Sequence, residues 1–260
     1  MLEAVIAAVK EAAKLAANTQ FTISSKGSSA NVVTSTDVAI QNLLQKRLSE
    51  LLPQSGFLGE ESDPSKLNAE YVWVIDPIDG TMNFTRGIRD SAISVALLRR
   101  GECILGVVYN FATDDLYHAE RGKGAYRNGQ PIHVSDRPFA EGLLCTAMSL
   151  YKKELAPLCF DIISELYMQS NDVRRLGSCA MELCYIADGK CDLYFEIRVY
   201  AWDCAAGELI LREAGAHVYR FFPEGYLEKP LPLIAANSAE NLEILRGVVQ
   251  KHFDKYDYKG

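Results

Sequence analysis

The 260-residue chain lacks the features that mark membrane, exported and nucleic-acid-binding proteins. No apolar run is long enough to span a bilayer, and charged residues at helical spacing interrupt the first twenty residues, unlike the core of a signal peptide. A formal net charge of −7 without a long basic run argues against nucleic-acid binding. We therefore expect a cytoplasmic protein with neither a membrane nor a nucleic-acid partner.

Cysteine and histidine motifs of familiar enzymes are missing as well. The seven cysteines form no C-x-x-C pair, and those in apolar runs, such as Cys103, are interpreted as buried, reduced thiols. The four histidines lie outside the acidic motifs, and no G-x-S-x-G or C-x5-R signature is present. A mechanism with a covalent nucleophile is therefore not expected.

The first half of the chain carries patterns of both helices and strands. Apolar periodicity predicts amphipathic helices over residues 1–18 and 36–51. The apolar run 71–75 predicts a buried strand that ends at Asp76, because the following proline blocks its continuation. Short apolar segments separated by turn residues predict a β-meander from Ser91 to Val134.

After Pro138 the pattern changes to alternating strands and helices. The predicted strands lie near 143–148, 172–176 and 191–196, and the predicted helices near 151–168, 178–188, 204–214 and 239–253. We predict an α+β first half (1–137) that holds the metal motifs and an α/β second half (138–260). No flexible linker separates them, so the halves are expected to pack closely.

Acidic residues occur at three sharp structural transitions, in the segments Gly59-Glu60-Glu61-Ser62, Asp76-Pro77-Ile78-Asp79-Gly80-Thr81 and Trp202-Asp203. Magnesium prefers such hard oxygen ligands. Asp76 and Asp79, three positions apart at the end of a buried strand, can converge on one ion or bridge two. If a helix begins after Gly80, its amide groups would face a bound phosphate, and Thr81 would orient the attacking water.

The motifs GEES, DPIDGTMNF and WDCAAGELILREAGA, in this order, resemble the inositol monophosphatase family of lithium-sensitive, magnesium-dependent phosphatases. The likeness covers essentially the whole chain. It implies a layered αβαβα sandwich, a homodimer, and two or three Mg²⁺ ions per site that support hydrolysis of a phosphate monoester by direct attack of a metal-activated water. Inositol monophosphate is the leading substrate, while fructose 1,6-bisphosphate, histidinol phosphate and 3′-phosphoadenosine 5′-phosphate stay open.

The resemblance also implies roles for individual residues. The implied metal ligands are Glu60, Asp76, the carbonyl of Ile78, Asp79 and Asp203. The implied catalytic residues are Asp37, Thr81 and Glu61. The implied substrate-binding residues are Lys26, Gly80, Thr81, Gly177, Ser178, Cys179, Glu196 and Asp203.

Each of these residues also has a purely structural explanation. Asp203 could cap the helix that follows it, the acidic pair at 60–61 could lie in a solvated loop, and Asp37 could be an exposed residue of a first helical turn. Glu196 could pair with Arg198. The alternative of another class is a non-catalytic relative that keeps the fold as a binding or regulatory subunit. The presence of all the implied metal ligands in one chain favours catalysis.

Overall fold

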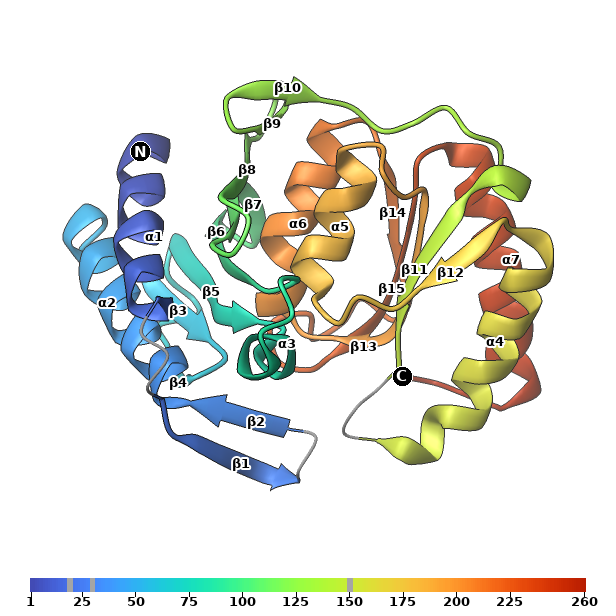
Figure 1. Cartoon of the computed structure of the whole chain (residues 1–260), viewed down its shortest axis with the longest axis horizontal. Coiled ribbons are helices and arrows are strands. Elements are labelled where there is room, and N and C mark those ends of the chain that lie inside the picture. The colour runs from blue at the N-terminus through green and yellow to red at the C-terminus, as the bar shows by residue number, and fades with distance from the viewer. Residues whose placement is uncertain (18–20, 29–30, 149–151) are drawn as a thin grey trace.

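Helices and sheets alternate in layers across the structure, which is a computed structural model that describes residues 1–17, 21–28, 31–148 and 152–260 (Figure 1). An eight-stranded sheet lies between two pairs of helices, and a five-stranded sheet lies between the second pair and a third. The predicted αβαβα sandwich is confirmed. The helices are α1 (Leu2–Ala16), α2 (Ser35–Leu51), α3 (Thr81–Arg86), α4 (Ala156–Gln169), α5 (Cys179–Ala187), α6 (Ala201–Glu213) and α7 (Ala239–Lys255).

The eight-stranded sheet has the order β10-β9-β8-β7-β6-β5-β3-β4 within the described residues. It contains β3 (Gly56–Gly59), β4 (Ser62–Ser65), β5 (Tyr71–Asp79), β6 (Ala92–Arg99), β7 (Glu102–Asn110), β8 (Asp115–Glu120), β9 (Ala125–Arg127) and β10 (Gln130–Ile132). The predicted meander forms the antiparallel run from β6 to β10. The only parallel pair among these strands is β3 with β5.

The five-stranded sheet has the order β12-β11-β13-β15-β14. Its strands are β11 (Leu143–Ala147), β12 (Asp172–Arg174), β13 (Leu193–Val199), β14 (His217–Arg220) and β15 (Leu231–Ala236). A separate hairpin of β1 (Ile23–Ser28) and β2 (Asn31–Thr34) precedes α2. The chain passes from the eight-stranded sheet to the five-stranded sheet between β10 and β11. The exact boundary between the two predicted halves, at residues 137 and 138, stays a prediction.

β5 divides its side chains between two hydrophobic cores, as the alternation of a strand requires. Trp73 and Ile75 pack with α1 and α2, whereas Val72 and Val74 pack with α5 and α6. Both faces of the strand are therefore covered by helices, which explains its continuous apolar sequence.

The expectation that this strand ends at Asp76 is wrong, since β5 continues to Asp79. The register of β5 against β6 shifts within this stretch: Asp76 lies opposite Ser94, and Asp79 lies opposite Ala92. Three steps on one strand therefore match two on the other, which is a β-bulge. Pro77 is accommodated there because a bulge leaves one residue outside the hydrogen-bond ladder.

Other boundaries also differ from the predictions. α6 begins at Ala201 rather than near 204, and α4 begins at Ala156 rather than near 151. The hairpin β1–β2 and the strands β3, β4, β14 and β15 were not predicted. These strands are short, and pairing with distant segments stabilises them more than their local sequence does.

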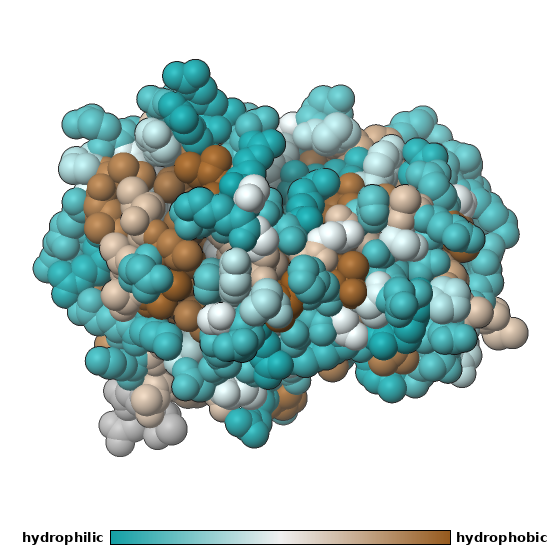
Figure 2. Space-filling view, turned by 90° about the horizontal axis from the view of Figure 1, so that it is seen from above, coloured by the Kyte–Doolittle hydropathy of each residue, from teal (hydrophilic) through white to brown (hydrophobic). Residues whose placement is uncertain are grey.

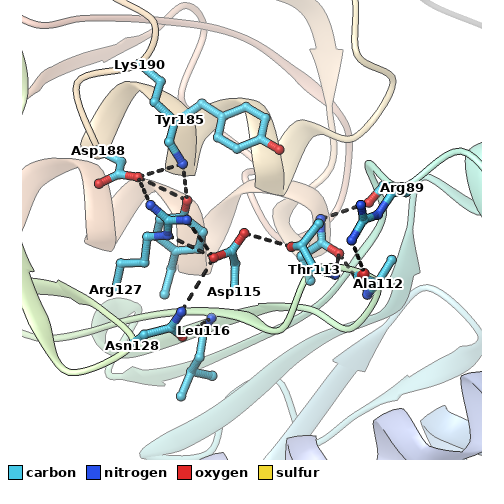
Figure 3. Close-up of polar contacts among 12 residues, drawn as sticks. Arg89, Ala112, Thr113, Asp115, Leu116, Arg127, Asn128, Tyr185, Asp188 and Lys190 are labelled. Carbon is cyan, nitrogen blue, oxygen red and sulfur yellow. Dashed lines mark hydrogen bonds and ion pairs between the residues drawn. The ribbon is translucent and has the colours of Figure 1, made fainter.

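A polar cluster joins the meander to the segment that follows α5 (Figure 3). Arg127 of β9 pairs with Asp115 of β8 at 2.8 Å and with Asp188 at 3.1 Å. Lys190 pairs with Asp188 at 2.7 Å and donates a hydrogen bond to the Tyr117 hydroxyl at 3.1 Å. The meander is thus connected to the segment between α5 and β13 by charged contacts as well as by the apolar core around α5 and α6.

The surface seen from above is mostly hydrophilic, and hydrophobic residues gather toward the side where α1 and α2 lie (Figure 2). Within the described ranges, none of the helices combines the length and apolar character needed to cross a membrane.

Candidate active site

The bulge in β5 brings two carboxylates to one face of the sheet. Residues three apart on a regular strand point to opposite faces, but the extra residue of a bulge restores the same face. Asp76 and Asp79 lie opposite Ser94 and Ala92, and Ala92 packs in the core around α5 and α6. Ile78, between them, packs on the other side with α1 and α2. Both aspartates therefore project toward α5 and α6.

Asp203 joins these aspartates from the first turn of α6. It is the third residue of that helix, and its Oδ2 accepts a hydrogen bond from the Tyr200 amide at 2.9 Å. Carboxylate oxygens of Asp76, Asp79 and Asp203 all lie within 4.8 Å of one another. Asp203 does not precede the helix, as considered from the sequence, but completes a capping box with Tyr200, which leaves its carboxylate within this cluster.

Glu60 reaches the same cavity from the turn after β3. Its amide donates to the Ile75 carbonyl at 3.2 Å, which continues the parallel pairing of β3 with β5. Its side chain lines the cavity together with the aspartates, and its negative charge raises the pKa of Asp76. The expected solvated acidic loop is therefore not what the structure shows for this residue.

Burial disfavours the ionisation of these carboxyl groups, and neighbouring carboxylates add to this effect for Asp76 and Asp203. Burial raises the pKa of Asp76 well above its ordinary value, and the charges of Glu60, Asp79 and Asp203 add to the shift. Burial likewise raises the pKa of Asp203, and it raises that of Asp79 to about 6. A divalent cation would oppose these shifts, because its positive charge favours the ionised form of each carboxylate. The set of hard oxygen donors fits such an ion.

Asp37 and Thr81 form a hydrogen-bonded pair at the edge of the cavity. Asp37 is fully buried, not exposed, and its Oδ2 accepts hydrogen bonds from the amide of Thr34, at 2.8 Å, and from the Thr34 hydroxyl. These contacts complete the N-terminal capping box of α2. The Thr81 hydroxyl lies 3.2 Å from Asp37 Oδ1 and 2.9 Å from the Ile78 carbonyl oxygen.

Ser178 contacts a carboxylate of the cluster. It is the N-cap of α5, and its hydroxyl donates to Asp79 Oδ2 at 2.6 Å. The amide of Ala180 donates to the same oxygen at 2.6 Å. The start of α5 therefore holds the Asp79 carboxylate in one orientation. The predicted contact of Ser178 with substrate stays a prediction.

The other predicted substrate residues surround the same space. Gly80, Gly177, Cys179 and Glu196 line the cavity, whose volume is about 120 Å³. Cys179 is buried, and its Sγ lies 3.1 Å from the Tyr194 hydroxyl, which donates a hydrogen bond to Glu196. Burial raises the pKa of Glu196 to about 7. The structure brings these residues together, and their roles stay predictions.

Among the predicted residues whose side chains are described, Asp37 and Glu61 do not line the cavity, and Asp37 is connected to it through Thr81. Glu61 lies in the turn after β3 but is not among the residues that line it. The backbone of Lys26 lies in β1, while its side chain lies outside the described part of the structure.

Several cavity residues were missed from the sequence. They are Val32, Met82, Ala147, Met148, Arg175, Arg198 and Tyr200. Met82 lies within the DPIDGTMNF motif, and the two arginines could have been noticed as charges close to predicted substrate residues.

Comparison with known proteins agrees with this geometry. The sequence profile of the inositol monophosphatase family matches residues 1–253. The chain belongs to the inositol monophosphatase family. It is 38% identical to the inositol-1-monophosphatase of Rhizobium meliloti, over 83% of this chain and 82% of that protein. It is 35% identical to the Nus factor SuhB of Escherichia coli K12, over 85% of both chains.

Solved structures give the same result. The extragenic suppressor protein suhB of Bartonella henselae superposes with a TM-score of 0.86 and 29% identity, covering 95% of this chain and 97% of that one. Membership of the inositol monophosphatase family supports a phosphatase that acts on small phosphorylated substrates. The family is generally metal-dependent, and the acidic cluster of this chain agrees with that property.

Proposed function

We propose that this chain hydrolyses a phosphate monoester of a small polyol or sugar in a Mg²⁺-dependent reaction in the cytoplasm. The observation that carries the proposal is the convergence of Asp76, Asp79 and Asp203, from β5 and α6, within 4.8 Å at one cavity. Such a cluster is electrostatically unfavourable without a cation, and phosphate ester hydrolysis needs positive charge at the reacting oxygens.

The ions would be held by the carboxylates of Glu60, Asp76, Asp79 and Asp203, with the Ile78 carbonyl as a further ligand. Two or three Mg²⁺ ions would activate the attacking water and neutralise charge on the leaving oxygen. Ser178 and the start of α5 would orient the Asp79 carboxylate, as groups around a metal site commonly do.

The attacking water would be oriented by Thr81. The Thr81 hydroxyl is near two acceptors, Asp37 and the Ile78 carbonyl, so its own proton is directed away from the water. Its oxygen lone pairs can then accept a hydrogen bond from that water. Asp37 would fix this orientation, and its burial keeps bulk water from competing. A catalytic role for Glu61 stays a prediction, and this geometry does not require one.

Inositol monophosphate is the leading substrate, because the Rhizobium meliloti relative is named inositol-1-monophosphatase and this chain matches most of that protein. Fructose 1,6-bisphosphate, histidinol phosphate and 3′-phosphoadenosine 5′-phosphate stay alternatives, since the carboxylate cluster recognises only the phosphate. A panel of these four substrates with Mg²⁺, compared by kcat/KM, tests the assignment.

The decisive control is Asp79→Asn. We expect it to reduce phosphate release at least about 1,000-fold, because it removes a charge from the cluster while it keeps the side-chain shape. Asp63→Asn, at an exposed position of β4, should leave the rate within about twofold. Wild-type protein that releases no phosphate from any of the four substrates would contradict the proposal.

A second function class has one observation in its favour. A relative is named a Nus factor, which suggests a role in binding other macromolecules. A chain with only that role would release no phosphate, and Asp79→Asn would leave its binding unchanged.

Inhibition by lithium, the absence of a nucleic-acid partner and the homodimer also stay predictions of the proposal.

A further inference from the structure

The turn before α5 is held from two sides by buried polar side chains that lie outside the cavity. This turn, residues 176–178, contributes to the cavity wall and carries the Ser178 hydroxyl that donates to Asp79. Asn83 of α3 and Glu182 of α5 both contact its backbone, and neither of them lines the cavity. The two residues are 8% and 0% exposed. They therefore support this part of the cavity wall from behind.

Asn83 links the turn to the segment after α3 through one amide group. Its Nδ2 donates to the Leu176 carbonyl oxygen at 2.6 Å and to the Asp90 carbonyl oxygen at 2.7 Å. Both N–H groups of the side-chain amide thus have an acceptor. Because Asn83 follows Asp79 by four positions in the sequence, this link fixes the turn relative to the motif that carries Asp79.

Glu182 binds the amide groups of the same turn. Its Oε1 accepts hydrogen bonds from the Leu176 amide at 2.7 Å and from the Gly177 amide at 3.1 Å. Its Oε2 is buried and has no hydrogen-bond partner among the described residues. A buried carboxyl group with one unsatisfied oxygen is costly. Ser178 already caps α5, so the helix itself does not require this carboxyl group.

The backbone of the turn needs such support because it contains a glycine. Gly177 has φ of 88°, and the absence of a side chain leaves many other conformations open to it. The hydrogen bonds to the carbonyl of Leu176 and to the two amides select one of them. In this conformation the Ser178 hydroxyl and the Ala180 amide both lie 2.6 Å from Asp79 Oδ2.

We propose that Asn83 and Glu182 are positioning residues, which fix the turn at 176–178 so that the start of α5 holds Asp79 in the orientation that binds a cation. The inference rests on the proposed function, because it assigns two further residues to the same site. A purely structural role would lower the stability of the protein and leave its affinity for Mg²⁺ unchanged. A positioning role lowers this affinity, although neither side chain is a proposed metal ligand.

Calorimetric titration of the purified chain with Mg²⁺, without substrate, tests the role of Asn83. We expect Asn83→Ala to raise the dissociation constant of Mg²⁺ about 10-fold, as the loss of groups around a metal site commonly does. Phosphate release by this variant should recover in part at high Mg²⁺ concentration. Asn83→Leu keeps the side-chain volume without the donors, and it takes the place of the alanine variant if that variant does not fold.

Asn237→Ala is the matched control. Asn237 is 4% exposed and donates to the carbonyl oxygens of Ser135 at 3.2 Å and of Arg137 at 2.9 Å, and it does not line the active-site cavity. Like Asn83, it joins two segments through backbone carbonyls. The variant should therefore lose thermal stability, but it should bind Mg²⁺ as the wild-type protein does.

Glu182→Gln and Glu182→Leu separate hydrogen bonding from charge. Both substitutions remove the negative charge, but only glutamine keeps an oxygen that can accept hydrogen bonds from the two amides. We expect Glu182→Leu to bind Mg²⁺ about 10-fold more weakly than Glu182→Gln. The difference between these two variants therefore measures the contribution of the hydrogen bonds alone.

A double-mutant cycle identifies the route of the effect. If Asn83 acts through the start of α5, the combined variant Asn83→Ala with Ser178→Ala should bind Mg²⁺ more tightly than the product of the two single effects predicts. The inference is overturned if the two effects simply multiply, if Asn83→Ala binds Mg²⁺ as the wild-type protein does, or if Glu182→Leu and Glu182→Gln bind it equally. Those results leave the proposed function in place, whereas wild-type protein that binds no Mg²⁺ overturns both.

Discussion

Asp79 is held in place by the protein before any ligand binds. Its Oδ2 accepts hydrogen bonds from the Ser178 hydroxyl and from the Ala180 amide, both at 2.6 Å. These donors direct the carboxylate, and they partly offset the effect of burial on its pKa. Ser178 is thus expected to act through Asp79 rather than through the substrate.

Ser178→Ala separates this positioning role from helix capping. We expect the variant to lose about 1 kcal/mol of stability, because the N-cap of α5 is removed, and to lose about 10-fold in kcat/KM, because Asp79 is less well oriented. Thermal unfolding and phosphate release measure the two effects.

Ser238→Ala provides the comparison. Ser238 caps α7, where its side chain accepts from the Asn241 amide at 3.1 Å, and it does not line the cavity. It should lose similar stability and keep its activity. Equal activity of the two variants would argue against a positioning role for Ser178.

The carboxylate cluster makes the stability of the metal-free protein depend on pH. The pKa of Asp79 rises from 3.8 to about 6 on folding, and those of Asp76 and Asp203 also rise well above their ordinary value. The folded protein therefore binds protons more tightly than the unfolded one. The stabilising contribution is complete below about pH 4 and is lost as the pH rises through the folded-state pKa values.

Mg²⁺ should reverse this loss. At pH 8, a concentration of 100 times the dissociation constant should raise Tm by about 5 to 10 °C relative to protein in EDTA. At pH 5 the rise should be much smaller, because protons compete for the carboxylates. Differential scanning fluorimetry at both pH values measures this difference. The same rise at both would show that the ion binds elsewhere.

Gly80 forms the turn between β5 and α3, next to the carboxylate cluster. Its φ of 83° is a conformation that favours glycine. A Cβ at this position would lie 2.9 Å from the Asp90 carbonyl oxygen and 3.1 Å from the Gly177 carbonyl oxygen. The turn therefore packs closely against the segment that begins α5.

Gly80→Ala should disturb this contact. We expect it to cost about 2 to 4 kcal/mol in stability and to reduce kcat strongly, because it combines backbone strain with a steric clash next to Asp79. Gly87→Ala, at the other end of α3, has φ of 69° but no neighbour within 4 Å of the added Cβ. It should lose only about 1 kcal/mol. Chemical denaturation compares the two variants, and similar losses would contradict the steric argument.

The cavity with the carboxylate cluster lies between the eight-stranded sheet and the five-stranded sheet. Strand β5 of one sheet and strands β11 and β13 of the other supply residues to the cavity, and the starts of α3, α5 and α6 supply further ones. The rigid layers on either side explain how carboxylates that repel one another can be kept close together.

The predicted homodimer can be checked on the intact protein. Light scattering after size-exclusion chromatography should give a mass near twice the 28.8 kDa of the chain. The hydrophobic residues gathered near α1 and α2 in Figure 2 are one surface that such an interface could cover. A mass equal to one chain across the micromolar range would contradict the prediction.

Much of the architecture could be predicted because the relevant patterns are local. The periodicity of α1, α2 and α7 and the turns of the meander depend on neighbouring residues. The start of α6 and the strands β14 and β15 were misplaced or missed. Their stability comes from packing and pairing with residues far away in the chain, which a local pattern does not record.

The sequence alone determined the kind of chemistry: acidic residues in recognisable motifs specify hard oxygen ligands wherever they lie. Tertiary structure decided how those residues are used. The bulge at Pro77 turns Asp79 to the same face as Asp76, the early start of α6 brings Asp203 to them, and β13 directs Arg198 into the cavity. Register and packing between distant segments set these directions, and neither can be read from the residues in isolation.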